Sequence, residues 1–130
     1  MRAQQVRYLN SHEQGLVDLL IAIGTRRNIA NVLVFLANVP SATSRDIERG
    51  TDLRQPEVSL AMSFLIEKGW IRNSERKSEN KGRPVKIYTL SGSLNAILDT
   101  IEQEQKERAQ KNLAALKKLR SAAPKTTGKK

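Results

Sequence analysis

The sequence predicts a mainly α-helical fold with one small β-hairpin, an α+β architecture, and two observations support this prediction. Apolar residues recur every three or four positions in several segments before residue 70 and again after residue 91, which is the helical period. The stretch "PVKIYTL" instead alternates with the two-residue period of a β-strand. A chain of 130 residues is long enough for one domain with its own core and one appendage.

Composition and charge favour a protein that binds a polyanion and argue against several classes of metal site and enzyme. Lys and Arg number 23 against 13 Asp and Glu, and the net charge of +10 attracts polyanions such as nucleic acid. Residues 68–90 carry seven basic residues against two acidic, and residues 117–130 carry six against none. The chain has no Cys and one His, His12, which excludes disulfides, thiolate metal sites and Cys nucleophiles. We expect no metal, no cofactor and no enzyme activity, because a Ser–His–acid set and a phosphate-binding glycine motif are also lacking.

The cellular setting follows from hydropathy. No apolar run reaches the roughly 18 to 20 residues of a membrane span. The first residues, "MRAQQVRYLN", are too polar for the core of a signal peptide. We expect a cytoplasmic, nucleoid-associated protein with no membrane partner.

Two helices are expected first. Residues 12–23 have helical spacing, with Ser11 as the N-terminal cap and Gly24 at the end. The expected inward face is Leu16, Leu19, Leu20 and Ile23. The next helix covers residues 25–39, begins at a Thr25 cap and stops at Pro40. It is apolar nearly all round, which predicts a central place in the core for Ile29, Val32, Leu33, Leu36 and Val39.

A short helix and a longer one follow. In "SATSRDIERG", Thr43 and Asp46 form a capping-box pattern, and Gly50 suits the C-terminal end. The next helix is "RQPEVSLAMSFLIEKG", in which Pro56 fits only the first turn and Gly69 ends the helix. Its expected inward face is Val58, Met62 and Leu65.

The hairpin and the last helix complete the pattern. "WIRNSERK" and "PVKIYTL" are expected to be strands, joined by a linker, "SENKGR", that is too long for a two-residue turn. Either Val85, Ile87 and Thr89 or Lys86, Tyr88 and Leu90 face inward, and the alternation alone leaves both possibilities open. A long helix then covers about residues 92–119, followed by a basic tail with the composition of a disordered segment.

The third and fourth helices have the spacing of a helix-turn-helix, which places its second helix in the major groove of DNA. The stretches "TSRDIERGTDLRQPEVSLAMSFLIEKGWI" and "KGRPVKIYTLS" together resemble the winged helix-turn-helix transcription regulators of the MarR, ArsR and TrmB kind, with archaeal single-domain members most similar. The resemblance covers residues 25–91. It implies a homodimer that binds double-stranded DNA and regulates transcription, with the hairpin as the wing.

The resemblance also implies a division of the chain. Residues 1–24 are expected to form an N-terminal helical arm, residues 25–91 the winged domain, residues 92–119 a C-terminal dimerisation helix and residues 120–130 a disordered basic tail. Apolar spacing in the two flanking helices and the habit of the family suggest the dimer interface. Its expected members are Leu16, Leu19, Leu20, Leu94, Ile97, Leu98 and Ile101.

The recognition helix departs from the family pattern because it carries few cations. The residues expected to face the groove are Arg54, Gln55, Glu57, Ser59, Leu60 and Ser63. Gln55 suits an adenine edge, and Leu60 suits a thymine methyl group. Glu57 either accepts from a cytosine amine or caps the helix start. The stripe of Leu60 and Phe64 faces either DNA or a protein surface.

Phosphate contacts are expected to supply most of the anchoring. The candidates are the helix start at Thr43 and Ser44 and the cations Arg45, Arg72, Lys77, Lys81, Arg83 and Lys86. Arg83, at the wing tip, also suits a narrow minor groove. Two alternative functions stay open: a winged-helix module that binds another protein, and an architectural protein that binds nucleic acid by charge alone. The sequence does not identify a small-molecule effector.

Overall fold

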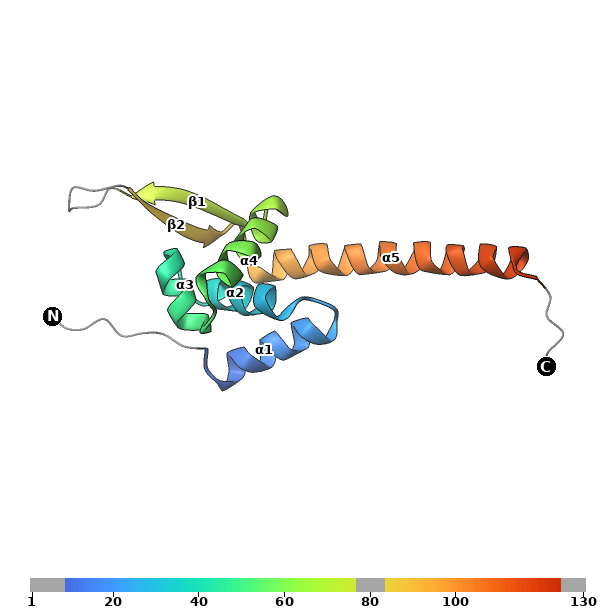
Figure 1. Ribbon diagram of the computed structural model, residues 1–130, viewed down its shortest axis with the longest axis horizontal. Helices are drawn as coiled ribbons and strands as arrows, with labels where there is room; N and C mark the ends of the chain where they lie inside the picture. Colours follow the sequence, from blue (N-terminus) through green and yellow to red (C-terminus); the bar gives the residue numbers. More distant parts are fainter. Residues whose placement is uncertain (1–8, 77–83, 125–130) are drawn as a thin grey trace. The chain divides into compact units, whose positions relative to one another are not determined.

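The structure, a computed structural model, describes residues 9–76 and 84–124 and confirms the mainly α-helical fold with one hairpin (Figure 1). The elements are α1 (Ser11–Ala22), α2 (Arg27–Ala37), α3 (Ser44–Thr51), α4 (Gln55–Glu67), β1 (Ile71–Arg76), β2 (Val85–Leu90) and α5 (Leu94–Ala122). The chain divides into two units, Met1–Leu94 and Asn95–Lys130. The first unit holds the helix-turn-helix and the hairpin, and the second consists mainly of α5.

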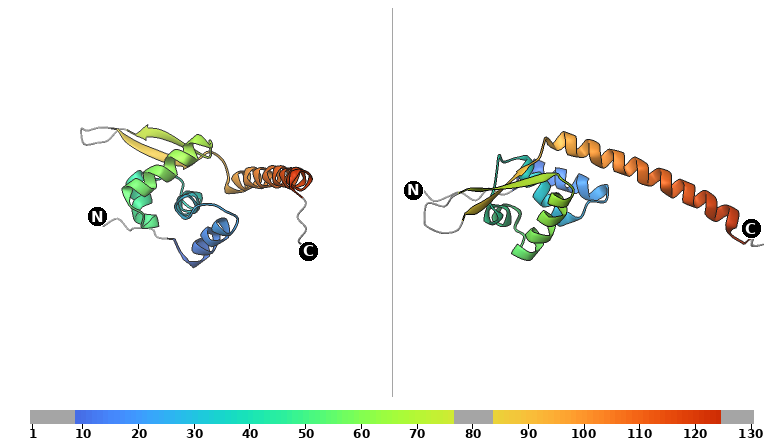
Figure 2. Two further views of the ribbon diagram at one scale, coloured as in Figure 1. Left: turned by 45° about the vertical axis from the view of Figure 1, so that its right-hand side comes forward. Right: turned by 90° about the horizontal axis from the view of Figure 1, so that it is seen from above.

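Helix α2 is the centre of the first unit, as its all-round apolar pattern predicts. Every residue from Ile29 to Leu36 is buried, including the polar Asn31, whose side-chain amide donates to the Arg27 carbonyl at 3.0 Å. Helices α1, α3 and α4 and strand β2 all pack against α2. The views in Figures 1 and 2 show α2 with α1 on one side and α3 and α4 on the other.

Helix α1 turns a different face to the core from the one expected. Val17 and Leu20 are buried, whereas Leu19 and Ile23 are exposed and Leu16 is half-buried. The inward face is therefore rotated by about one residue. Glu13 is also buried on this face, one turn before Val17, because its carboxylate takes part in the helix cap.

The caps of the first two helices differ from the prediction. Asn10, not Ser11, caps α1: its side chain accepts from the Glu13 N–H, and the Glu13 carboxylate accepts from the Asn10 N–H, both at 2.9 Å. The N-cap of α2 is Arg26, not Thr25, and Arg26 makes no side-chain cap bond. Helix α1 thus begins at a cap as favourable as Ser11, whereas α2 begins one residue after the more favourable Thr25.

The turn between α3 and α4 uses a left-handed residue, but not the expected Gly50. Gly50 is buried inside the last turn of α3, and Asp52 takes the left-handed conformation with φ of 61° and ψ of 30°. Asp tolerates this conformation better than most side chains do. The expected capping box of Thr43 and Asp46 at the start of α3 is confirmed.

The end of α4 is a Schellman motif that sends the chain into β1. Gly69, with φ of 78°, donates its N–H to the Ile66 carbonyl, and Trp70 donates to the Leu65 carbonyl at 3.0 Å. The Trp70 ring meets the Phe64 ring edge-on, with centroids 6.2 Å apart. This is the apolar contact that commonly accompanies the motif. The expected helix stop at Gly69 is therefore confirmed.

The register of the hairpin decides which strand face is inward. The strands are antiparallel, and Asn73 is paired with Tyr88 and Glu75 with Lys86. Cross-strand partners share a face, so Lys86, Tyr88 and Leu90 lie with Ile71 and Asn73 on one side. Tyr88 is also bridged to Ala42, immediately before α3. This is the inward face, and Val85, Ile87 and Thr89 occupy the other one.

Helix α5 is longer than expected and ends at Ala122, three residues beyond the expected end at residue 119. Ile97 and Ile101 are buried, while Leu113, Leu116 and Leu119 are exposed. The part of the expected tail from residue 125 onward lies outside the described residues. Among the residues that the structure describes, no helix combines the length and the apolar character of a membrane span.

Candidate nucleic-acid interface

Helix α4 has one face in the core and a polar face outside it. Val58, Ala61, Met62 and Leu65 are buried. The expected recognition residues Gln55, Ser59, Leu60 and Ser63 are exposed. This separation follows from the 3.6-residue period of the helix. The side of α4 away from α2 is thus open and carries hydroxyl, amide and aliphatic groups.

The start of α4 decides between the two roles of Glu57. The N–H of Arg54 donates to Glu57 Oε1 at 2.9 Å, so the Glu57 side chain folds back on the helix start. This contact supports the capping role, and one of its two carboxylate oxygens is already engaged. Pro56 occupies the first turn, where its missing N–H leaves no helix bond unmade.

The outer face of α4 continues into a groove of about 260 Å³ that also touches α3 and the hairpin. Its lining residues are Ser44, Gln55, Val58, Ser59, Met62, Ser63, Ile66, Asn73, Lys86 and Tyr88. Five of the expected contact residues therefore come together here: Ser44, Gln55, Ser59, Ser63 and Lys86. The wall is mostly polar and neutral, with Lys86 as its cation.

Asn73 and Tyr88 are members of this groove that the sequence reasoning did not place there. The alternation of β2 puts Tyr88 on the same face as Lys86, but only the register of the hairpin shows that this face points at α4. Ile66 is also in the groove, because it lies about one turn beyond Met62 on the same side of α4. Knowledge of the strand pairing would have found Asn73 and Tyr88, and helical spacing alone would have found Ile66.

The start of α3 is the second predicted phosphate site. Thr43 and Asp46 close a reciprocal cap: the Asp46 N–H donates to Thr43 Oγ1 at 3.1 Å, and the Thr43 N–H donates to Asp46 Oδ2 at 3.0 Å. Two of the first-turn N–H groups are therefore satisfied by the cap. The N–H groups of Ser44 and Arg45 have no acceptor within the helix because they belong to its first turn. The Asp46 carboxylate shares this end, which lowers its attraction for an anion.

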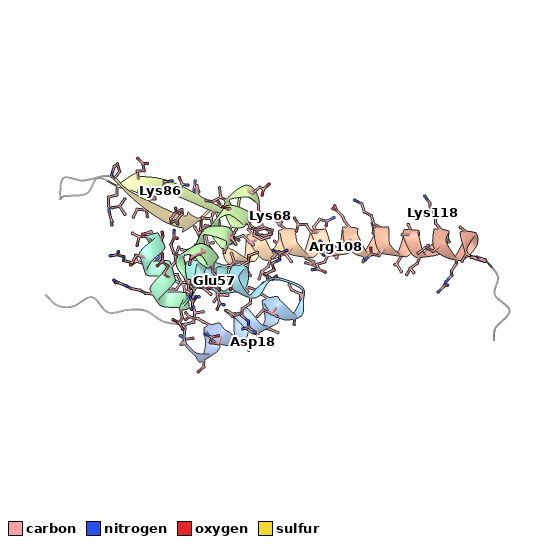
Figure 3. The ribbon with its side chains drawn as sticks, in the orientation of Figure 1. Asp18, Glu57, Lys68, Lys86, Arg108 and Lys118 are labelled. Atoms are coloured by element: carbon pink, nitrogen blue, oxygen red, sulfur yellow. The ribbon has the colours of Figure 1, made fainter. Side chains whose placement is uncertain are left out.

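The predicted cations of the hairpin separate onto two faces. Lys86 lies on the groove side, where Figure 3 shows it on the hairpin, and it is paired across the strands with Glu75. Arg72 is paired with Thr89 and lies on the opposite side. Arg76 shares that side with Arg72 and was not among the predicted contacts, although it belongs to the basic run of residues 68–90. Lys77, Lys81 and Arg83 lie outside the described residues.

The stripe of Leu60 and Phe64 divides between two environments. Leu60 is 76% exposed on the open side of α4. Phe64 is only 39% exposed, because its ring packs against Trp70 and beneath the Lys68 ammonium group, which is 5.9 Å from the ring centroid. Phe64 therefore supports the junction of α4 with β1, and Leu60 is the apolar side chain presented outward.

The residues expected at a dimer interface differ in exposure. Leu20, Ile97 and Ile101 are buried within the chain. Leu16 and Leu94 are half-buried, and Leu19 and Leu98 are exposed. In this structure Leu19 and Leu98 are thus the members of the set that are most open to a partner.

The groove and the outer face of α4 suit hydrogen bonds to the base edges of a nucleic acid better than strong electrostatic attraction to its phosphates. Between Arg54 and Lys68 the helix contains no cation. The groove offers Ser and Tyr hydroxyls and Asn and Gln amides, which both donate and accept. Within the described part of the chain, no group of three His, Asp or Glu side chains is placed to hold a metal ion.

Comparison with known proteins supports the fold. The sequence matches no protein-family model. No curated protein matches it either. A possible transcriptional regulator from Methanosarcina mazei Go1 has a similar structure, with a TM-score of 0.61 and 22% identity, over 77% of this chain and 83% of that one. A MarR family regulator from Neisseria meningitidis has a TM-score of 0.53 and 20% identity, over 78% of this chain and 70% of that one.

A third structure extends the likeness to a chromatin protein. TrmBL2, an archaeal chromatin protein whose structure is described as showing a novel mode of DNA binding, has a TM-score of 0.63 and 17% identity. The match covers 90% of this chain and 48% of TrmBL2, so this chain spans about half of that protein. At these identities the three likenesses establish the winged-helix fold, and the resemblance to MarR and TrmB regulators holds at the level of fold.

Proposed function

We propose that the protein is a homodimeric, sequence-specific DNA-binding regulator of transcription and not an enzyme. The observation that supports this most strongly is the largely polar groove that joins the outer face of α4 to α3 and the hairpin. A helix that follows a helix-turn and carries amide and hydroxyl groups on its open side suits the major groove of B-DNA. The solved structures with this fold are described as transcription regulators or a chromatin protein, which agrees with the proposal.

In this proposal α4 reads bases with few side chains. Gln55, exposed at the start of the helix, bonds the N6 and N7 edge of an adenine. Ser59 and Ser63, one turn apart, bond base edges or bridging waters. Leu60, the most exposed of the set, packs on a thymine methyl group. Glu57 keeps its cap and makes no base contact.

Phosphates are held from the two sides of this helix. The N-terminal N–H groups of α3 and the Arg45 side chain take one strand, and Lys86 takes a phosphate beside the groove. The wing-tip cations Lys77, Lys81 and Arg83 complete the phosphate contacts, with Arg83 in the minor groove. Arg72, on the opposite face of the hairpin from Lys86, contributes less. Because phosphate contacts carry no sequence information, discrimination rests on α4.

A gel-shift and footprinting experiment on fragments of the source genome tests the proposal. At moderate salt we expect protection of discrete sites that contain two symmetry-related halves, with binding that excess random duplex fails to remove. If excess random duplex removes the protein equally from every fragment, and if binding weakens steeply with salt, the protein is an architectural protein instead. No binding to any duplex would leave protein interaction as the function of the fold.

A further inference from the structure

Helix α5 contains two short segments with the same apolar pattern and opposite charge. Residues 98–102 read "LDTIE" and residues 116–120 read "LKKLR". Leu98 corresponds to Leu116, and Ile101 corresponds to Leu119. The acidic Asp99 and Glu102 occupy the positions that the basic Lys117 and Arg120 occupy in the second segment. Of the four apolar residues in this charge-inverted repeat, Ile101 is buried, whereas Leu98, Leu116 and Leu119 are exposed.

The spacing of the repeat places both segments on one face of α5. Corresponding residues are eighteen positions apart, which is about five turns of an α-helix. The two leucines therefore share a stripe, and the carboxylates lie along the same flank of that stripe as the cations. Both members of the apolar pair at Leu98 and Leu116 are exposed, at 36% and 50%.

From this pattern we infer that α5 binds the α5 helix of a second copy of the chain in antiparallel orientation. In that orientation, "LDTIE" of one copy lies beside "LKKLR" of the other, at both ends of the pair. The two-fold axis falls near Ala109, a small residue that allows close approach of the helix backbones. The inference deepens the proposed homodimer and rests on it, but it does not depend on DNA binding.

The distribution of charge along α5 favours antiparallel over parallel pairing of the two helices. Residues 94–105 contain Asp99, Glu102 and Glu104 and no cation. Residues 106–122 contain six cations and a single acidic residue, Glu107; Figure 3 shows two of the cations, Arg108 and Lys118, along this half. Parallel pairing would place the acidic half against the acidic half and the basic against the basic. Antiparallel pairing places opposite charges together, and in antiparallel helices each flank meets the same flank of the partner, as this repeat requires.

The exposed apolar residues in the second half of α5 also suggest contact with a partner helix. Leu113, Leu116 and Leu119 are exposed by 65%, 50% and 62% on the described α5 helix. They follow one another every three residues and form an apolar strip on a highly charged helix. A second α5 helix, on which Leu98 is exposed, covers part of this strip. Because α5 is about 43 Å long, the two helices can form a long contact.

Distances between spin labels test the orientation directly. The natural chain has no Cys, so Asn95→Cys, Gln110→Cys and Ser121→Cys each carry one label, at exposed positions near the two ends and the middle of α5. Antiparallel pairing predicts about 42 Å between the two labels at 95, about 36 Å at 121 and less than about 20 Å at 110. Distances under about 20 Å at all three positions would overturn the orientation. The absence of any intermolecular distance would overturn the pairing, and neither result bears on DNA binding because DNA is absent.

Exchanging the acidic and basic residues of the two segments tests the same antiparallel pairing. Asp99→Lys with Glu102→Lys is expected to weaken dimerisation by about tenfold or more, because cations then face Lys117 and Arg120. Adding Lys117→Glu and Arg120→Glu restores opposite charges and is expected to restore the wild-type dimer constant in sedimentation equilibrium. In a parallel pair the first two changes would leave like charges facing like charges and would therefore not weaken dimerisation. Retained helix content by circular dichroism shows that each variant is folded, and failure of the exchange to restore dimerisation contradicts the proposal.

Discussion

Ala42 and Tyr88 exchange two backbone hydrogen bonds: the Ala42 N–H donates to the Tyr88 carbonyl at 3.0 Å, and the Tyr88 N–H donates to the Ala42 carbonyl at 2.8 Å. Ala42 comes directly before Thr43, the cap of α3. The bridge therefore fixes β2 to the start of the helix-turn-helix. It turns the Tyr88 side chain, and with it Lys86, toward the groove beside α4.

This fixed orientation predicts different roles for two cations of the hairpin. Lys86→Ala is expected to weaken binding to all duplex sequences to a similar extent and to lower the salt slope by about 1, as the loss of one phosphate contact does. Arg72→Ala, on the opposite face of the hairpin, is the matched control and is expected to have the smaller effect. Fluorescence anisotropy at several salt concentrations measures both. An equal or larger effect of Arg72→Ala would mean that the outer face of the hairpin meets DNA.

Gln55 is expected to carry base discrimination. Gln55→Ala should cost about 1–3 kcal/mol on the preferred site and relax the preference at one or two base pairs, because it removes a bidentate contact. Binding to random duplex should change little. The control is Gln103→Ala on α5, which also removes an exposed amide. Competition against single-base variants of the site gives the answer, and a uniform loss on all sequences would contradict a base-reading role for Gln55.

Glu57 is expected to act at the helix start and not on a base. Glu57→Gln keeps an oxygen that accepts from the Arg54 N–H but removes a negative charge near the DNA. We expect affinity for all duplexes to rise by a similar factor, with the sequence preference unchanged, because one repulsion of phosphate is removed. The loss of preference at a C·G pair would show instead that the carboxylate accepts from cytosine.

Two glycines predict stability changes of opposite sign. Gly69→Ala should destabilise the fold by about 1–2 kcal/mol, because Gly69 has φ of 78°, which L side chains rarely adopt. The added Cβ would meet no atom within 4 Å, so the cost comes from the backbone conformation alone. Gly15→Ala, at an open position inside α1, should stabilise the protein by about 0.5–1 kcal/mol. Urea unfolding of both variants measures the difference. An undiminished stability of Gly69→Ala would contradict the left-handed role of Gly69 at the end of α4, and destabilisation by Gly15→Ala would contradict the open helical position of Gly15.

The periodicity of apolar residues and the capping residues at helix ends predicted the helices and strands, because both are visible in short stretches of sequence. The nearly continuous apolar run around Leu33 predicted the central helix, and the Thr43 and Asp46 pair predicted the start of α3. Periodicity does not decide which of two adjacent apolar residues faces the core. Leu16 and Val17 differ by one position, and the neighbouring α2 selects Val17.

The candidate site was predictable only in part, because much of it depends on pairing between distant segments. Gln55, Ser59 and Ser63 share the outer side of one helix, which helical spacing alone reveals. Asn73 joins the groove through its register with Tyr88, which alternation leaves undetermined. The role of Glu57 also required coordinates, since a carboxylate at that position suits either a cap or a base contact.

Selection from a random duplex library at about 0.15 M salt, followed by affinity measurement, tests the central claim most directly. If α4 reads bases in a homodimer, selection should enrich one motif with two symmetry-related halves. That motif should be bound at least about 1,000-fold more tightly than random duplex. Enrichment of no motif, with equal affinity for selected and unselected duplexes, would contradict sequence-specific recognition by this surface.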